Sequence, residues 1–271
     1  MSDKIMDHYE VLTELKNSTK KDLEEANKLY KIAESLLIYN QKMWPIHLKS
    51  LMEKEQNSVT IFKNKYPSSV YALEELYEGS KEESVKLLKR FPAYFEKACK
   101  EASLDIDPTS RHPRYRVCNS FIEVEISEKM ERARIFDREG ILEEITCDIG
   151  AIIESLQFHK ERLFGREFNG MKFLLNVYRQ YEYLIKKEKM SKGDSIPIRK
   201  ITTRMGKNIK EFRTDEFLLD ISRLVRENIL VIDGWKLDFQ QTKDSKKGIL
   251  LHGFEDRGYV GFITFKKEVS E

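Results

Sequence analysis

The stretch FRTDEFLLDISRLVRENILVIDGWKLDF, residues 212–239, predicts a helix followed by a two-strand ribbon. Thr214 and Asp215 supply a helix start, because polar oxygens at this position accept hydrogen bonds from the free amides of the first turn. Asp233 and Gly234 stand between two β-rich runs, and this pair favours the tight turn of a hairpin. The stretch therefore predicts a helix–hairpin unit, and its charges bear on what the unit binds.

The flanking residues complete a characteristic order of elements. Asn169 caps a predicted helix in GMKFLLNVYRQYEYLIKKEKM, residues 170–190, and SIPIRKITTRMG, residues 195–206, contains a short strand and a second helix. After the hairpin, GILLHGFEDRGYVGFITFKK, residues 248–267, supplies one or two further strands. This order of helix, strand, helix, helix and hairpin is typical of a winged helix, which we predict for residues 166–271.

Glycine usage separates this part from a helical N-terminal half. Gly79 is the only glycine before residue 140, although the chain has 12, and glycine weakens helices. We therefore predict a helical region over residues 1–103. Its first long helix is expected to break near Asn17-Ser18, with Pro45 as a kink or an end.

Shorter helices are predicted in the rest of this region. One follows Ser68-Ser69 and ends at Gly79, where a helix commonly stops. Another begins at the capping box Ser80-x-x-Glu83, and a third begins with a proline at its first position.

Two apolar stripes run along the first long helix at the alternating spacing of three and four residues found in coiled coils. Two stripes are more than one neighbouring helix can cover. Either a helical bundle buries both stripes internally, or one stripe stays free for a partner helix. The first stripe includes Tyr9, Leu12, Leu23, Ala26, Tyr30, Ala33 and Leu37, and the second comprises Leu29, Ile32, Leu36, Tyr39 and Met43.

Residues 104–165 change character and form an acidic segment. A proline-containing loop leads to predicted strands in YRVCNSFIEVEI, RARIF and ILEEI, and Asp148 is expected to cap a helix that ends at Gly165. Residues 101–170 contain 10 basic and 15 acidic side chains, a net charge of −5. The sequence as a whole predicts an α+β fold that is mainly α, in three regions: 1–103, 104–165 and 166–271.

The charges on the predicted third helix, residues 213–227, favour a protein partner over DNA. In winged-helix DNA binders this helix usually enters the major groove. Here three arginines stand against four acids and the first turn is acidic, so phosphates would meet carboxylates. Asp215, Glu216, Asp220 and Arg223 are therefore candidates for a protein interface.

Positive charge gathers on other parts of the same unit. Residues 186–210 contain nine Lys or Arg and two acids, a net charge of +7, and three lysines follow in the predicted wing loop. Such a ridge could hold a DNA backbone without reading its sequence, or it could be a solvated surface. The candidate residues are Arg199, Lys200, Arg204, Lys207, Lys210, Lys243, Lys246 and Lys247.

Few features point to a chemical reaction, so we expect no enzyme and no cofactor. The histidines and three cysteines show no zinc-ligand spacing, and no phosphate-binding GxxxxGK[ST] loop is present. Asp107, Glu123 and Glu125 would suit a metal-dependent nuclease, but the lysine of that motif is missing. The run from Arg111 to Arg116 is either an anion clamp or a basic loop that pairs with the acidic segment around it. No signal peptide or transmembrane run is visible, so we expect a cytoplasmic protein with no membrane partner.

The layout as a whole resembles the non-ATPase accessory subunits of SMC-like bacterial defence complexes, which act against viruses and plasmids, including the Lamassu type and, more distantly, kleisins. The resemblance rests on the helical N-terminus, on DPTSRHPRY with FIEVEI, on RLFGREFNG before a helix, and on a C-terminal winged helix containing DRGYVGFITF. Kleisins join the coiled-coil neck of one ATPase through N-terminal helices and dock a winged helix beneath the head of another.

The resemblance implies one partner surface at each end of the chain. The stripe of Leu23, Tyr30, Ala33 and Leu37 would bind the coiled-coil neck, and the 213–227 helix with its ribbon would bind the head. The chain lacks the long disordered middle of a kleisin, so a compact accessory subunit that links ATPase heads to a nuclease or to DNA fits better than a ring closer. The alternatives are a free-standing winged-helix DNA-binding regulator and a metal-dependent nuclease.

Overall fold

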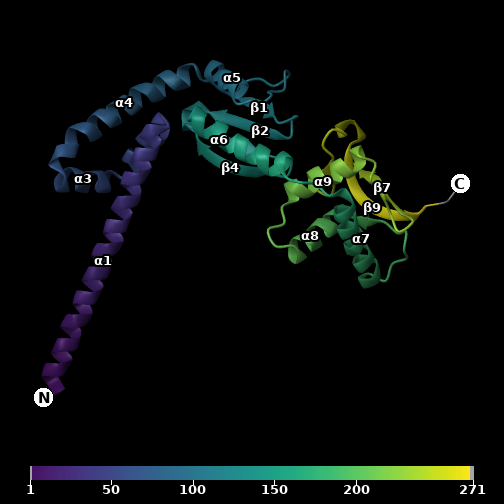
Figure 1. Ribbon diagram of the computed structural model, residues 1–271, viewed down its shortest axis with the longest axis horizontal. Coiled ribbons are helices and arrows are strands. Elements are labelled where there is room, and N and C mark those ends of the chain that lie inside the picture. The colour runs from purple at the N-terminus through teal and green to yellow at the C-terminus, as the bar shows by residue number, and fades with distance from the viewer. Residues whose placement is uncertain (1, 269–271) are drawn as a thin grey trace.

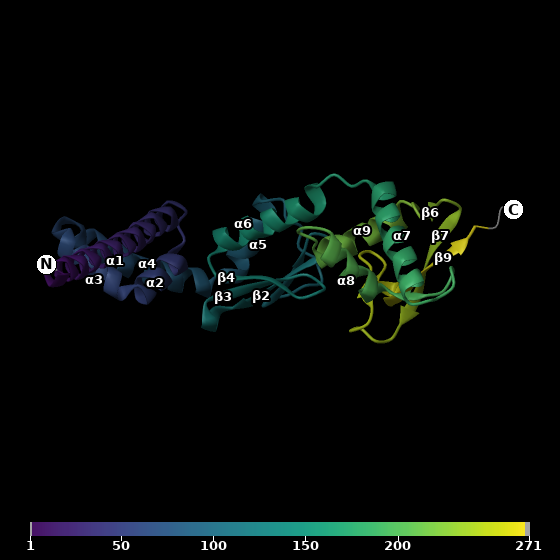
Figure 2. The same ribbon diagram turned by 90° about the horizontal axis from the view of Figure 1, so that it is seen from below.

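The chain is elongated, with a helical part, a small sheet and a mixed C-terminal unit arranged in a row (Figures 1 and 2). The computed structural model describes residues 2–268, with side chains from residue 8 onward. The fold is α+β, as the sequence predicts: helices predominate in the N-terminal part, and two antiparallel sheets follow. No helix in the described part of the chain is long and apolar enough to cross a bilayer.

The N-terminal part is built on one long helix, α1 (Ser2–Gln41), which projects from the body (Figure 1). The predicted break at Asn17-Ser18 does not occur, because these residues cost a helix only about 0.5 kcal/mol each and neither is proline or glycine. Pro45 lies in the first turn of the next helix, where its missing amide costs nothing. The remaining helices are α2 (Pro45–Lys54), α3 (Gln56–Lys65), α4 (Val70–Lys89) and α5 (Phe91–Glu101), with the short η1 (Pro67–Ser69) before α4.

The helix α4 corrects two predictions about helix ends. Gly79 and Ser80 lie inside it and neither ends nor begins a helix. The hydroxyl of Ser80 donates to the carbonyl of Tyr77 at 2.7 Å, and Ser84 donates to Ser80 at 2.6 Å. Both serines are buried, so their hydroxyls bond within the helix instead of capping a new one.

The middle part is a four-stranded antiparallel meander whose strands follow one another in the sheet. The predicted single strand YRVCNSFIEVEI is in fact a hairpin, because Cys118, Asn119 and Ser120 all adopt positive φ angles near 55–62° and turn the chain. The helices α5 and α6 (Ile149–Lys160) cover one face of the sheet (Figure 2). The strands are β1 (Arg114–Val117), β2 (Ile122–Ser127), β3 (Arg132–Phe136) and β4 (Ile141–Thr146), with the one-turn η2 (Glu128–Met130) between β2 and β3.

Asp148 joins the middle part to the N-terminal helices. It stands at the N-cap position of α6, as predicted, but its carboxylate makes no capping bond there. Instead it accepts hydrogen bonds from the backbone amides of Ile46 at 3.0 Å and His47 at 2.7 Å, and from the His47 ring at 2.6 Å. These amides belong to the first turn of α2, where a carboxylate is stabilising. Asp148 is 1% exposed.

The C-terminal part contains the predicted order of helix, strand, helix, helix and hairpin. Asn169 caps the first helix by accepting from the Lys172 amide at 2.9 Å, and Asp233 and Gly234 form the hairpin turn with φ of 49° and 71°. Strands pair in the order β5-β9-β7-β6, and β8 pairs with β9. The elements are α7 (Gly170–Lys187), β5 (Ile196–Pro197), α8 (Ile198–Asn208), α9 (Thr214–Arg226), β6 (Val231–Ile232), β7 (Trp235–Thr242), β8 (Ile249–Leu250), η4 (Glu255–Arg257) and β9 (Tyr259–Lys267).

The buried residues form two clusters. One cluster runs continuously from α5 through the meander to the sheet of the C-terminal part, and includes Phe95, Val124 and Phe265. A separate small cluster holds α1, α2 and their neighbours together through Ile32, Leu36, Leu48 and Met52. One hydrophobic cluster therefore spans the middle and C-terminal parts, and it also includes Ile46 of α2.

Candidate interfaces

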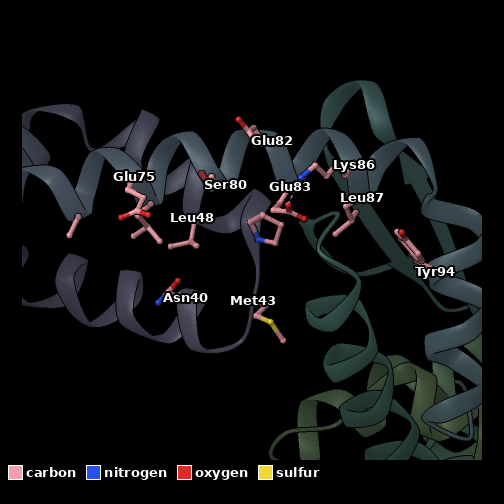
Figure 3. Close-up of a pocket in the computed structure, with 14 residues that line it drawn as sticks. Asn40, Met43, Leu48, Glu75, Ser80, Glu82, Glu83, Lys86, Leu87 and Tyr94 are labelled. Atoms are coloured by element: carbon pink, nitrogen blue, oxygen red, sulfur yellow. Dashed lines mark hydrogen bonds and ion pairs between the residues drawn. The ribbon is translucent and has the colours of Figure 1, made fainter.

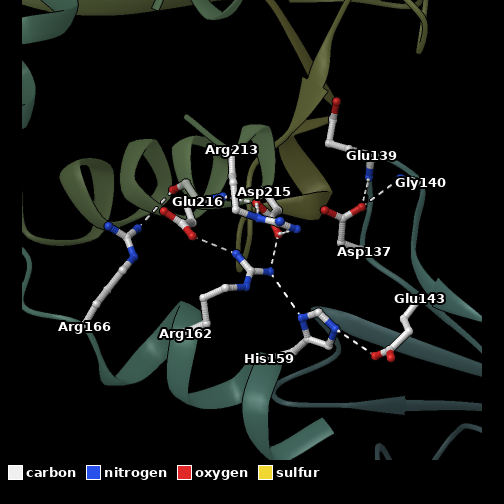
Figure 4. Close-up of polar contacts among 10 residues, drawn as sticks. All are labelled: Asp137, Glu139, Gly140, Glu143, His159, Arg162, Arg166, Arg213, Asp215 and Glu216. Carbon is white, nitrogen blue, oxygen red and sulfur yellow. Dashed lines mark hydrogen bonds and ion pairs between the residues drawn. The ribbon is translucent and has the colours of Figure 1, made fainter. Parts of the chain in front are cut away.

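A cluster of ion pairs joins α9 to the segment that precedes the C-terminal unit (Figure 4). The helix α6 continues into a π-helical turn, η3 (Glu161–Gly165), which supplies Arg162. Its guanidinium bonds to the Asp215 carboxylate and, at 2.8 Å between Nη1 and Oε1, to Glu216. Arg166 bonds to the Asp220 carboxylate and to the Glu216 carbonyl at 3.2 Å. Two arginines thus neutralise the acidic face of α9.

Burial makes this cluster sensitive to the loss of any one charge. Asp215 and Asp220 are 3% and 6% exposed. Burial alone would raise the pKa of Asp215, but hydrogen bonds from Arg162 and Arg213 hold that pKa below its ordinary value. Burial raises the pKa of Asp220, and Arg166 offsets this only in part. A carboxylate or guanidinium left alone in such a place is strongly destabilising.

This geometry bears on the role predicted for Asp215, Glu216, Asp220 and Arg223. The sequence predicts that their charges face a partner protein, whereas the structure gives them partners within the chain. Arg223 donates to the carbonyl of Leu163 at 3.3 Å and lies 3.8 Å from Asp220. Sequence reasoning missed the two arginines of the preceding segment because they lie about fifty residues away and no local pattern connects them to α9.

Four of the predicted phosphate-binding residues do come together, in a groove of about 360 Å³ between α7 and α8. Lys200 pairs with Glu188 at 2.7 Å, and the guanidinium of Arg204 stacks 3.2 Å from the ring centroid of Tyr183. The groove is lined by Leu184, Lys187, Glu188, Arg199, Lys200, Thr203, Arg204 and Lys207. We call it the basic groove.

Two lysines of the basic groove are free to meet an anion. Lys187 and Lys207 are exposed and form no ion pair with any residue in the range 8–268. Lys187 belongs to the basic run 186–210 but was not among the individual candidates, because sequence alone does not bring the end of α7 beside α8. The two ammonium groups remain hydrated and available to a phosphate backbone.

Arg199 has a structural role that the sequence did not predict. Its guanidinium pairs with Glu139, in the turn between β3 and β4, and its Nη2 donates to the Gly248 carbonyl at 2.7 Å. One side chain therefore ties α8 both to the meander and to the loop after β7. Because the Arg199 guanidinium is already paired with Glu139, it is less available to a DNA phosphate than the unpaired lysines.

The remaining predicted phosphate contacts lie outside the basic groove. Lys243, Lys246 and Lys247 lie exposed in the turn between β7 and β8, where Lys247 is 3.5 Å from Asp244. Lys210 follows the end of α8 and its side chain is 92% exposed. The turn that contains these three lysines is linked to the basic groove through Arg199, whose Nη2 donates to the Gly248 carbonyl.

The two stripes of α1 have different environments. Leu29, Ile32 and Leu36 of the second stripe are buried, and Ile32 and Leu36 pack against the neighbouring helices. In contrast, large residues of the first stripe are uncovered: Tyr9 is 71%, Leu12 63%, Leu23 61%, Tyr30 66% and Leu37 57% exposed. In the isolated chain, therefore, the first stripe is left uncovered. We call these five residues, together with Ala26 and Ala33, the α1 stripe.

Two depressions adjoin the α1 region. One, of about 560 Å³, lies where Ala26, Tyr30 and Ala33 of the α1 stripe meet Phe62 and Tyr66 near the end of α3. The other, of about 720 Å³, lies between the α1–α2 corner and α4 (Figure 3). Leu48 points into the second depression from α2, and Met43 at the corner is 83% exposed.

The acids considered for a nuclease are each held by a local partner. The Asp107 carboxylate accepts from Ser120 and Thr109, which lowers its pKa. Glu125 pairs with Arg114 at 3.2 Å, the arrangement expected of a basic loop within an acidic segment. Within residues 2–268 no group of three or more His, Cys, Asp or Glu side chains is placed to hold a metal ion.

Comparisons with protein-family models, with curated proteins and with solved structures find no match to this chain.

Proposed function

We propose that this chain is a non-catalytic accessory subunit that docks through the α1 stripe on a coiled-coil helix of a larger ATPase of the SMC-like kind, within a bacterial DNA-sensing defence complex. The observation that carries the proposal is the α1 stripe itself. A projecting helix with a heptad-spaced row of Leu and Tyr, more than half exposed, is the surface that a partner helix covers in a coiled coil.

Residue size along the stripe supports a helical partner over a flat surface. Large Leu23, Tyr30 and Leu37 alternate with small Ala26 and Ala33, so the stripe presents knobs separated by holes. The adjoining 560 Å³ depression extends these holes toward α3. A second helix could seat its own side chains over both alanines. The resemblance to accessory subunits of SMC-like complexes points to an ATPase neck as the source of that helix.

The burial of α9 argues against the free-standing regulator. A recognition helix needs an exposed face to enter the major groove, but Phe217 to Ser222 are all buried and the acidic first turn is occupied by Arg162. DNA contact, where it occurs, is assigned in this proposal to the basic groove and to phosphates. The subunit would then link an ATPase, and a nuclease effector bound to the same complex, to a DNA backbone of any sequence.

The test replaces Leu23, Tyr30 and Leu37 with glutamine, which keeps helix propensity. Burying such a side chain fully contributes about 1.5–3 kcal/mol, so the exposed parts of three contribute about 3–5 kcal/mol to docking, or at least a hundredfold in affinity. We expect the tagged triple variant to lose a coiled-coil ATPase that the wild-type chain retains on purification from its native cell. Its unfolding free energy should change by less than about 0.5 kcal/mol for each site.

A matched control substitutes Lys187 and Lys207 with glutamate, far from α1. This variant should keep the ATPase and lose DNA. Equal retention of the ATPase by wild type and the stripe variant would refute docking through α1, and recovery of nucleic acid alone, removable by salt, would favour the regulator.

A further inference from the structure

A polar cleft of about 1000 Å³ lies where the meander meets the C-terminal unit, separate from both the α1 stripe and the basic groove. One wall is the outward face of β1 to β3 with the hairpin tip at Asn119 to Phe121. The other wall is the C-terminal end of α9 and the loop from Leu250 to Glu255. Its size falls in the range of pockets that hold small organic ligands.

Two cationic side chains enter the cleft from opposite walls. Arg138, in the turn after β3, pairs with Glu255 across the cleft, yet its Nη1 is buried and has no hydrogen-bond partner. Arg226, at the end of α9, is exposed and forms no ion pair among the residues with described side chains. Arg138 therefore has one N–H group without a hydrogen-bond partner, and the guanidinium of Arg226 is not engaged in any ion pair among these residues.

His252 lines the same cleft as these two arginines. It is 4% exposed, and its Nδ1 is buried without a hydrogen-bond partner, 3.9 Å from the nearest Glu255 oxygen. Burial, together with the charges of Arg138 and Arg226, lowers the pKa of His252 to about 4. The imidazole is therefore uncharged at neutral pH, and a neutral imidazole has one N–H donor.

The acids of the cleft limit the charge of a ligand. Glu125 is engaged by Arg114 at 3.2 Å, Glu255 by Arg138, and Asp137 accepts the amides of Glu139 and Gly140 at 2.7 Å each. Four arginines and four acids line the cleft, so their formal charges cancel. A long polyanion gains little from such a site, whereas one compact anion can use the unpartnered donors.

We propose that this cleft binds a small phosphate monoester with a flat organic group, of nucleoside monophosphate size. The phosphate oxygens accept from Arg226, Arg138 and His252, which leaves none of these donors unsatisfied. The apolar parts of Phe136 and Leu250, which line the same cleft, face the organic group. Because the two walls belong to different parts of the chain, the ligand also braces the C-terminal unit against the meander.

The test is calorimetric titration of the full chain with four probes: inorganic phosphate, ribose 5-phosphate, a mixed set of nucleoside monophosphates, and the corresponding nucleosides. We expect the monophosphates to bind and to raise the unfolding temperature, ribose phosphate and phosphate to bind more weakly, and the nucleosides not to bind. Tight binding of inorganic phosphate alone would overturn the organic part of the ligand and assign a simple anion site.

Two variants locate the binding. Arg226→Ala removes an exposed side chain and should weaken monophosphate binding about tenfold or more without affecting folding. His252→Phe keeps the ring and removes the donor, and should weaken binding in the same direction. Arg179→Ala, which removes an exposed arginine on α7 outside the cleft, is the control. Absence of binding by every probe at millimolar concentration, or equal binding by wild type and Arg226→Ala, would overturn the proposal and leave ordered water as the partner of these donors.

Discussion

Replacement of Asp215 by alanine should destabilise the chain strongly, although sequence reasoning places this residue on a partner-facing surface. The change removes the main partner of Arg162, whose side chain is 16% exposed, and also a partner of Arg213. Breaking a buried ion pair typically costs about 3–5 kcal/mol, because the remaining charge is left without compensation. Glu216 stays 2.8 Å from Arg162 and can take over part of the pairing. We therefore expect a loss of about 2–4 kcal/mol in the free energy of unfolding.

The measurement is urea unfolding followed by circular dichroism, with Glu83→Ala as the matched control. Lys86 Nζ lies 2.7 Å from Glu83 Oε1, close to the 2.8 Å between Arg162 and Glu216, but the Lys86 and Glu83 side chains are 62% and 61% exposed. Exposed pairs contribute about 0–1 kcal/mol. The double variant Arg162→Ala with Asp215→Ala should cost less than the sum of the single changes, since it leaves no unpaired charge. If Asp215→Ala lowered the free energy of unfolding by less than about 1 kcal/mol, as expected for the control, the view that Asp215 belongs to a stabilising buried ion pair would be refuted.

Three further outcomes follow from other contacts. Asp148→Ala should lower the free energy of unfolding by about 3 kcal/mol, because two amides and an imidazole lose their acceptor. Hydrogen exchange at the Ile46 amide should become faster. An unchanged exchange rate would contradict the link between α2 and the meander. In the folded chain the pKa of His252 is lowered from 6.5 to about 4, so between pH 6.5 and pH 4 the unfolded chain binds one proton more than the folded chain. The free energy of unfolding should therefore stay constant above pH 6.5 and fall toward pH 4 by up to about 1.4 kcal/mol per pH unit. Urea unfolding of His252→Phe across this range should lack that part of the slope, and identical slopes would count against a buried neutral ring. Lys187→Glu with Lys207→Glu should reduce the salt dependence of duplex DNA binding by about two phosphate contacts, measured by fluorescence anisotropy at several salt concentrations; an unchanged slope would remove the basic groove as a DNA contact.

Local signals predicted the elements of the C-terminal part well. The Asn169 cap and the Asp233-Gly234 turn each depend on residues within a few positions of one another, so the sequence contains their whole cause. The start of α9 at Thr214 was placed correctly, but the predicted cap is absent: Arg213 occupies the N-cap position and makes no side-chain capping bond. The hairpin at Cys118 to Ser120 was missed because its positive φ angles fall on residues that include no glycine. In α4 the local signals were misleading, because Gly79 and the sequence Ser80-x-x-Glu83 indicated a helix end and a helix start that do not occur.

The candidate sites were less predictable because they depend on long-range contacts. Asp148 reaches α2 from about a hundred residues away, and Arg162 reaches α9 from about fifty. The same charges that predicted an interface on α9 turned out to be internal, since sequence gives the number of charges and not which of them are buried. The sequence predicted both apolar stripes of α1, because the spacing of the residues alone defines them. Which of the two stripes is covered depends on packing, which the spacing does not show.

The most direct test of the central claim is site-specific photo-cross-linking in the native cell. A photoreactive phenylalanine derivative at Tyr30, 66% exposed on the α1 stripe, would be compared with the same group at Met130, equally exposed on the meander. We predict that Tyr30 cross-links to a coiled-coil segment of a large ATPase and that Met130 does not. A cross-link from Tyr30 only to a second copy of this chain, or to no protein, would contradict the accessory-subunit proposal.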